Sequence, residues 1–136
     1  PAILDMIGGQ IAAVSGPIGE FTQHVAAGKC RLLGATGAKR SQFAPQTATL
    51  AEQGMKDFVY SEWFGFYVPA KTPVDIVNRL NAALRVALAA PETVSGLAVM
   101  GLEAQSSTPA ELAARLKADT ERWGPLVKTI GFTAEG

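Results

Sequence analysis

The first third of the chain alternates helical patterns with short apolar runs, and glycine or proline separates each segment from the next. The successive segments are a helical pattern over residues 1–7, an apolar run over 10–14, a helical pattern over 17–27 and an apolar run over 30–36. Glycine ends a helix readily because it takes the left-handed conformation without strain, and proline is tolerated in the first helical turn. Helix, strand, helix, strand is the order of an α/β layer with parallel strands, so the pattern predicts an α/β fold.

The composition excludes several classes of protein. Of the 136 residues, 48% are hydrophobic and 18% are charged, which is too apolar for intrinsic disorder. Twelve basic residues balance 12 acidic ones, so the net charge of +0 offers no attraction for nucleic acid or an anionic membrane. One cysteine and one histidine cannot form an intrachain disulfide or a zinc site. We therefore expect no nucleic-acid partner, no metal and no cofactor.

The apolar stretches and the start of the chain indicate whether it has a membrane-spanning segment or a leader segment. Glycine or a charged residue interrupts every apolar stretch before it reaches the roughly 18 residues that span a bilayer. The chain opens at Pro1 without a basic leader segment or an initiator methionine. We therefore expect it to begin inside a longer protein.

Aromatic and β-branched residues concentrate in Phe58–Val68. Five of the chain's ten aromatic residues lie between Tyr60 and Tyr67. This composition favours one long strand or two collinear strands. Because aromatic side chains bury large areas, the run predicts that Trp63 and Phe64 are largely buried.

Helix-start signals mark three later positions. Thr49 with Glu52, and Thr108 with Glu111, have the spacing of capping boxes, in which each side chain satisfies the other residue's backbone N–H. Thr72 precedes proline and is expected to be a third N-cap. The predicted helices are a short one after Thr49 that stops at Gly54, one after Thr72, one from Pro91 to about Gly101, and one after Thr108 with a kink or break at Gly124-Pro125.

One turn has the features of an anion site. It joins the C-terminal end of a predicted strand to the start of a predicted helix, where free N–H groups and the helix dipole attract carboxylates. Ligands of open α/β sheets bind at that edge. Such turns also occur without a ligand, so both interpretations remain open. The residues of this turn are Ser15, Gly16, Pro17, Ile18 and Gly19.

No set of residues has the spacing of a catalytic site. His24 lacks a neighbouring nucleophile and orienting acid, so we interpret it as an exposed or capping histidine. Cys30 fits a small apolar core residue. Ser15 is not in a G-x-S-x-G turn, which excludes an α/β hydrolase. Lys39 and Arg40 are interpreted as a solvated basic pair in a loop.

An ordered series of short motifs extends along almost the whole chain. The motifs are Ile7–Ile11, Ala27–Lys29 with the run to Thr36, Lys39–Ser41, Leu50–Gly54, Glu62–Gly65, Pro69-Ala70, Thr72-Pro73, Arg79–Asn81, Gly101, Thr108-Pro109, Trp123 and Ile130-Gly131. In this order and spacing the chain resembles the solute-binding proteins of tripartite tricarboxylate transporters, the Bug or TctC family. One departure is Ala48, which stands where the family usually has proline before Thr49 and makes that loop less stiff.

The resemblance implies a place in a larger fold. Family members have two α/β lobes that close on a ligand, as in type II-like periplasmic binding proteins, and are about twice this length. The chain is then the C-terminal part of such a protein. By the resemblance, residues 1–61 are the latter part of the second lobe, residues 62–71 are a hinge-crossing strand that carries Trp63 and Phe64, and residues 72–136 are helices that return to the first lobe.

The resemblance also implies a function in the periplasm without catalysis. Family members capture small carboxylates, such as di- and tricarboxylates or amino acids, and serve the membrane permease subunits of the transporter. The turn from Ser15 to Gly19 matches the position of a ligand-facing loop. We therefore expect Ser15, Gly16, Pro17, Ile18 and Gly19 to bind the ligand in the complete protein.

A second hypothesis belongs to a different class, namely a self-associating interaction module that binds no ligand. The helices after residue 72 carry apolar stripes that would cover a sheet mostly absent from this chain. Exchange of segments between two copies is a low-cost route to a homodimer. A third hypothesis, an enzyme, is the weakest, because no nucleophile, base and acid occur together.

Overall fold

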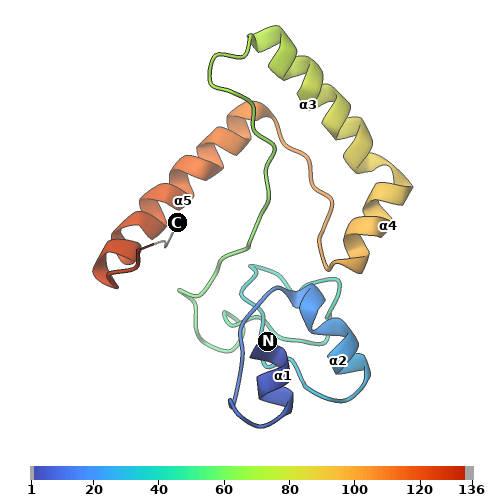
Figure 1. The fold of residues 1–136 in the computed structure, drawn as a ribbon, viewed down its shortest axis with the longest axis vertical. Helices are drawn as coiled ribbons and strands as arrows, with labels where there is room; N and C mark the ends of the chain where they lie inside the picture. The colour runs from blue at the N-terminus through green and yellow to red at the C-terminus, as the bar shows by residue number, and fades with distance from the viewer. Residues whose placement is uncertain (1, 134–136) are drawn as a thin grey trace. The chain divides into compact units, whose positions relative to one another are not determined.

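The computed structural model describes residues 2–133, and over that range it contains helices but no strand (Figure 1). The helices in chain order are α1 (Ala2–Ile7), the 3-10 helix η1 (Ile18–Glu20), α2 (Thr22–Ala26), α3 (Val74–Ala89), α4 (Pro91–Val99) and α5 (Pro109–Thr129). The chain forms two compact units. Unit 1 holds residues 2–64 and 91–104, and unit 2 holds residues 65–90 and 105–133.

Glycines end the first helices of unit 1, as the sequence predicts. Gly9 follows α1 with φ 82°, and Gly28 follows α2 with φ 67°. At the end of α2 the amides of Gly28 and Lys29 donate to the carbonyls of Val25 and His24, each at 2.9 Å, which is the paired bonding of a Schellman motif. The helix predicted over residues 17–27 is realised as η1 and α2.

The strands predicted over residues 10–14 and 30–36 do not form among the described residues. The second segment makes a single parallel bridge, between Ala35 and Thr49. In it the Ala35 amide donates to the Ala48 carbonyl at 3.2 Å and the Leu50 amide donates to the Ala35 carbonyl at 2.8 Å. A strand exists through its ladder of hydrogen bonds, and one bridge supplies too few of them.

The capping box predicted at Thr49 is present and supports this bridge. The Thr49 amide donates to Glu52 Oε2 at 2.6 Å, and the Glu52 amide donates to Thr49 Oγ1 at 3.1 Å. The segment that follows is a turn rather than the predicted helix, and it ends at Gly54, whose φ is 98°. Arg40 adds an ion pair with Glu52 at 2.9 Å.

The aromatic run Phe58–Val68 forms neither a helix nor a strand, so the predicted strand is wrong for the described residues. Its backbone is tied to unit 1 where the Tyr60 amide donates to the Thr36 carbonyl at 2.9 Å. Trp63 is half-buried, whereas Phe64 is 73% exposed, which corrects the prediction that both are largely buried. Aromatic composition favours a covered strand, but burial depends on elements that cover it, and none covers the ring of Phe64 here.

In unit 2 the Thr108 capping box begins α5 as predicted. The Glu111 amide donates to Thr108 Oγ1 at 3.2 Å, and the Thr108 amide donates to Glu111 Oε2 at 2.7 Å. The predicted cap at Thr72 is wrong, because α3 has Pro73 as its N-cap, with no side-chain hydrogen bond. Of the kink or break predicted at Gly124-Pro125, the break does not occur, since α5 continues to Thr129 with Pro125 inside it. Pro125 removes one backbone bond in the final turns, which the helix tolerates there.

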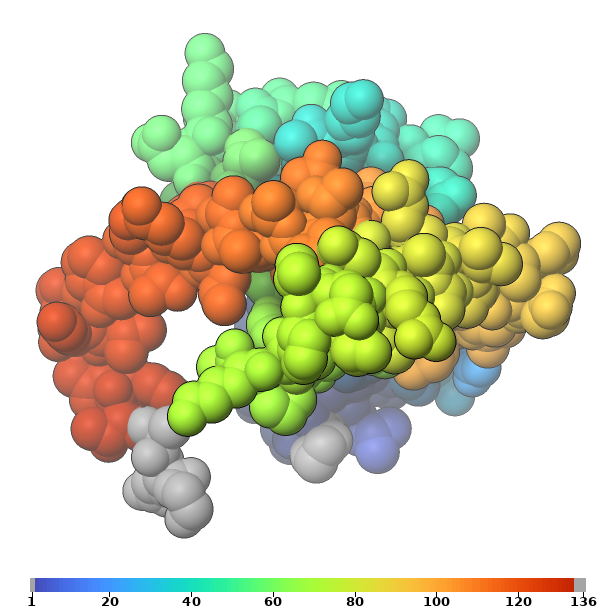
Figure 2. Space-filling view, turned by 90° about the horizontal axis from the view of Figure 1, so that it is seen from above, coloured from blue at the N-terminus to red at the C-terminus, as the bar shows by residue number. Residues whose placement is uncertain are grey.

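Very little of the described chain is buried. Phe21, at 6% exposure, is the one buried apolar side chain among residues 2–133, and Thr49 is the one buried polar side chain. No residue of α3, α4 or α5 is buried, and side chains of these helices lie at the surface (Figure 2). Within the described range no single helix is long and apolar enough to cross a membrane. Taken together, α3 and α4 are long and apolar enough, but they are bent relative to each other by 72°. Core helices of proteins outside membranes can have the same length and composition.

Candidate functional site

The predicted ligand-binding residues form one turn of unit 1 that leads into η1. Ser15, Gly16 and Pro17 are exposed, whereas Ile18 and Gly19 are half-buried. Pro17 is the N-cap of η1, with φ −58° and ψ 135°, and its carbonyl accepts a hydrogen bond from the Glu20 amide at 3.1 Å. The sequence reaches this geometry because proline holds φ near the value that the start of a helix needs.

The buried ring of Phe21 anchors the turn. The Phe21 amide donates to the Ile18 carbonyl at 3.0 Å. A β-carbon built on Gly16 would lie 3.5 Å from two ring carbons of Phe21, which is ordinary van der Waals contact. The turn therefore folds over the ring, and its shape depends on the one buried apolar side chain among the described residues.

The turn presents unpaired backbone donors. The amides of Gly16, Ile18 and Gly19 donate to no acceptor among residues 2–133. The Gly19 carbonyl is already used, because it accepts a hydrogen bond from Thr22 Oγ1 at 3.1 Å. The first N–H groups of a helix have no intrahelical acceptor and can donate to a carboxylate. Such an arrangement of donors can bind an anion.

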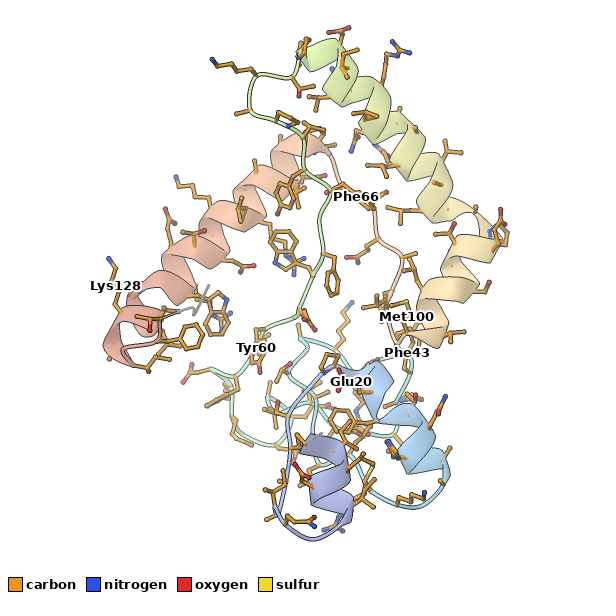
Figure 3. All side chains as sticks on the ribbon, in the orientation of Figure 1. Glu20, Phe43, Tyr60, Phe66, Met100 and Lys128 are labelled. Atoms are coloured by element: carbon orange, nitrogen blue, oxygen red, sulfur yellow. The ribbon has the colours of Figure 1, made fainter. Side chains whose placement is uncertain are left out.

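Two neighbours of the turn were not anticipated from the sequence. A β-carbon on Gly16 would lie 3.8 Å from Glu20 Oε2, so a carboxylate of the protein itself stands beside the turn. The end of α4, at Met100 and Gly101, packs against Gly19. Figure 3 labels Glu20 and Met100 where the two segments approach. The contact between Gly19 and Gly101 has no signal in the local sequence. The nearness of Glu20 could have been expected, because Glu20 follows the turn directly in η1.

The other polar residues considered from the sequence lie elsewhere. His24, on α2, and Cys30 are half-buried, and Cys30 is a free thiol. Lys39 and Arg40 are both exposed, in agreement with a solvated basic pair, and Arg40 also makes an ion pair with Glu52. In the part of the chain that the structure describes, no hydrogen bond or ion pair joins these four residues to the turn. Over the same range no three His, Cys, Asp or Glu side chains gather as a metal site would require.

The Arg40 ion pair changes the acidity of its partner. The Arg40 guanidinium donates to Glu52 from Nε at 3.0 Å, and the Thr49 amide donates to the same carboxylate. These hydrogen bonds lower the pKa of Glu52 from 4.5 to about 2, with the bond from Arg40 contributing most. The exposed pair thus holds the Thr49 turn in place and has no free charge for a ligand.

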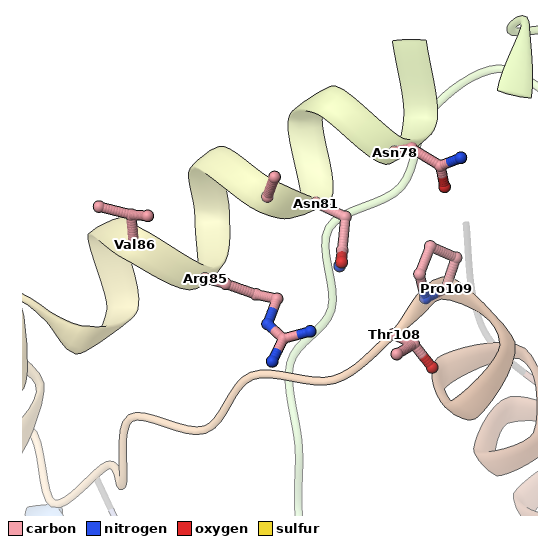
Figure 4. A pocket seen from close by; sticks show the side chains of 7 residues that line it. Asn78, Asn81, Arg85, Val86, Thr108 and Pro109 are labelled. Atoms are coloured by element: carbon pink, nitrogen blue, oxygen red, sulfur yellow. The ribbon is translucent and has the colours of Figure 1, made fainter. Parts of the chain in front are cut away.

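A hollow of about 580 Å³ lies on unit 2 (Figure 4). Two of its polar lining residues, Asn81 and Thr108, make hydrogen bonds to residues outside the lining. Asn81 Nδ2 donates to the Ser107 carbonyl at 2.8 Å, and Thr108 is engaged with Glu111. The bonds from Thr108, aided by the charge of Arg85, lower the pKa of Glu111. The hollow is therefore a junction that ties α3 to the start of α5. Its lining residues are Asn78, Asn81, Ala82, Arg85, Val86, Thr108 and Pro109.

Comparison with known proteins places the chain in a family. The family model for the tripartite tricarboxylate transporter family receptor, TctC, matches residues 1–132. The chain belongs to the TctC family. The family resemblance predicted from the ordered motifs is therefore confirmed.

Relatives of this TctC-family chain come from several bacteria. It is 34% identical over 128 residues to a UPF0065 protein in the tcbD-tcbE intergenic region of Pseudomonas sp. strain P51, covering 93% of this chain and 38% of the relative. A UPF0065 protein in the clcB-clcD intergenic region of Pseudomonas knackmussii is 33% identical, with 93% of this chain and 76% of the relative covered. BugT of Bordetella pertussis is 30% identical, with 96% and 40% covered.

Solved structures confirm the fold class. A structure described as a periplasmic transporter superposes with a TM-score of 0.79 and 30% identity, covering 94% of this chain and 43% of that one. The periplasmic binding protein BugD superposes with a TM-score of 0.71 and 28% identity, covering 96% and 44%. The TctC-family chain thus has the fold of part of a periplasmic binding protein and spans less than half the length of these two structures.

Proposed function

We propose that this chain forms the ligand-facing part of an extracytoplasmic solute-binding protein that captures a small carboxylate for the permease subunits of a tripartite transporter. It performs no catalysis and needs no cofactor. The observation that carries the proposal is the turn of a TctC-family chain that presents the unpaired amides of Gly16, Ile18 and Gly19. Ser15 can add a hydroxyl, whereas Pro17 has no N–H to donate.

The ligand's carboxylate is held by charge-assisted hydrogen bonds from this turn. Each such bond contributes about 1.5–3 kcal/mol, so losing one weakens affinity by roughly ten- to a hundredfold. The chain alone binds far more weakly than a family-length protein, because a second lobe is needed to remove water from the carboxylate. In the complete protein, Trp63 and Phe64 lie at the hinge between the lobes.

Calorimetry on a family-length protein containing this sequence tests the proposal. We expect binding of at least one of citrate, succinate and glutamate, and we expect Gly16→Val to weaken it at least tenfold by blocking the approach to the amides. Ala13→Val, which adds the same side chain at an exposed position just before the turn, is the control. Equal affinity of Gly16→Val and the unsubstituted protein contradicts the site, and no binding by any of the three ligands contradicts the function.

One observation favours a second candidate, self-association without a ligand. Helices α3, α4 and α5 have no buried residue, and large apolar side chains on them are exposed, among them Val86, Val99 and Leu126. A second copy of the chain can cover such side chains. Sedimentation of the 136-residue chain separates the two candidates, because a monomer at high concentration excludes the second.

A further inference from the structure

The end of α4 has a geometry that only glycine supports well. The amides of Gly101 and Leu102 donate to the carbonyls of Ala98 and Leu97 at 2.9 and 3.0 Å, which is the paired bonding of a Schellman motif. This places Gly101 in the left-handed conformation, with φ 70°. The same motif leaves the carbonyl of Met100 at the end of the helix without an intrahelical donor.

Gly101 differs from the other left-handed glycines of the described chain. Gly9, Gly28, Gly54 and Gly131 also have positive φ, but a β-carbon on any of them would meet nothing within 4 Å. A β-carbon on Gly101 would lie 2.6 Å from both Cα and N of Gly19. The close approach at Gly101 therefore comes from the proposed ligand turn itself.

The contact is reciprocal. A β-carbon on Gly19 would lie 2.5 Å from the carbonyl carbon of Met100, 3.1 Å from the Gly101 amide nitrogen, and too close to the Met100 oxygen. Distances this short fall on rigid backbone, which cannot move aside as a flexible side chain can. The two segments meet backbone to backbone, and any side chain at either glycine separates them.

We infer that Gly19 and Gly101 are positioning residues. Because neither has a side chain, the Ser15–Gly19 turn can pack directly against the C-terminal end of α4, and this contact fixes where the amides of the turn meet a carboxylate. The inference rests on the proposed function, since it concerns the same turn. Because Gly101 packs against the Gly19 nitrogen, Gly19 serves mainly in this contact, and the donors to the ligand are Gly16 and Ile18.

Hydrogen exchange on the 136-residue chain tests the contact independently of any ligand. Gly19→Ala and Gly101→Ala are expected to speed exchange at least tenfold at the amides of Glu20 and Phe21, whose bonds to Pro17 and Ile18 close the turn. Gly101→Asn, which tolerates positive φ but adds a β-carbon, is expected to do the same. The double alanine variant is expected to exchange no faster than the more affected single variant, because both changes break one contact.

The chain offers matched controls. Gly28→Ala places a β-carbon at φ 67° in open space, and Gly96→Ala places one on α4 with nothing within 4 Å. Both are expected to leave exchange at Glu20 and Phe21 within threefold of the unsubstituted chain. Unchanged exchange in Gly19→Ala and Gly101→Ala, or fully additive effects in the double variant, overturns the inference.

Citrate binding to the family-length protein separates this inference from the proposed function. Faster exchange together with at least tenfold weaker binding in both glycine variants supports both. Faster exchange in both glycine variants, with citrate affinity unchanged in them and in Gly16→Val, supports the contact and overturns the turn as the ligand site. Binding that weakens in Gly16→Val but not in Gly19→Ala or Gly101→Ala overturns the positioning role and leaves the proposed function in place.

Discussion

Glu20 is the residue whose charge bears most directly on the proposed carboxylate site. Its Oε2 lies 3.8 Å from the position of a β-carbon on Gly16, so it repels an anion approaching the same turn. At a separation of about 6 Å in water the repulsion is roughly 0.7 kcal/mol per ligand charge. We therefore expect Glu20→Gln to tighten citrate binding to the family-length protein about threefold or more in calorimetry at low salt.

A distant carboxylate provides the control for Glu20. Glu92 lies in the first turn of α4, about 10 Å along the helix from Val99 at its other end, so its repulsion of a ligand at the turn is weaker than that of Glu20. Glu92→Gln is expected to change citrate affinity by less than Glu20→Gln does. Equal affinity of Glu20→Gln and the unsubstituted protein would mean that the ligand binds away from this turn.

The Arg40–Glu52 pair leads to a prediction about pH. Because the folded-state pKa of Glu52 is about 2, below the ordinary 4.5, the pair stabilises the Thr49 turn fully above pH 4.5. That stabilisation decreases as the pH falls through about 2. Arg40→Gln removes the largest cause, so the pKa of Glu52 is expected to rise toward 4.5 in a titration followed by carboxyl carbon shifts. A Glu52 pKa that stays near 2 in this variant contradicts the assigned cause.

At the scale of the element, α5 depends on its capping box. Thr108→Ala removes the hydroxyl that accepts from the Glu111 amide, at a cost of about 1 kcal/mol. Amides in the first turns of α5 should then exchange about fivefold faster. Thr120→Ala is the matched control, since Thr120 Oγ1 donates only to Leu116 within the same exposed helix. Equal exchange in both variants would show that the cap contributes little.

Elements were predictable where their signals are local. Two capping boxes, Thr49 with Glu52 and Thr108 with Glu111, follow from the three-residue spacing of each pair. Gly28 and Gly101 end helices because each takes a positive φ, which glycine adopts without strain. The predicted strands failed because a strand needs neighbouring strands, which no local pattern supplies. Neither the exposure of Phe64 nor the packing of Gly19 against the end of α4 was predictable from the sequence, because each depends on segments that are distant along the chain.

For the whole molecule, the predicted class is confirmed by two periplasmic binding proteins of more than twice the aligned length. The predicted lobe boundaries at residues 61 and 72 remain a prediction. They rest on the family resemblance, whereas the division of this chain into two units reflects its own contacts. The sequence does not identify the ligand, because backbone amides bind a carboxylate whatever molecule carries it.

The burial of a single apolar side chain, Phe21, among residues 2–133 has a calorimetric consequence. The heat capacity increment of unfolding arises from apolar surface newly exposed to water, and for a globular domain of 136 residues it is about 1.6–2.0 kcal/mol/K. Diluted to where it sediments as a monomer, this chain should show less than half that increment and a broad melting transition. A full increment at that dilution would mean that the free chain collapses around its exposed aromatic rings. With so small an increment, its stability curve is nearly flat, so cooling should strengthen or weaken the fold very little.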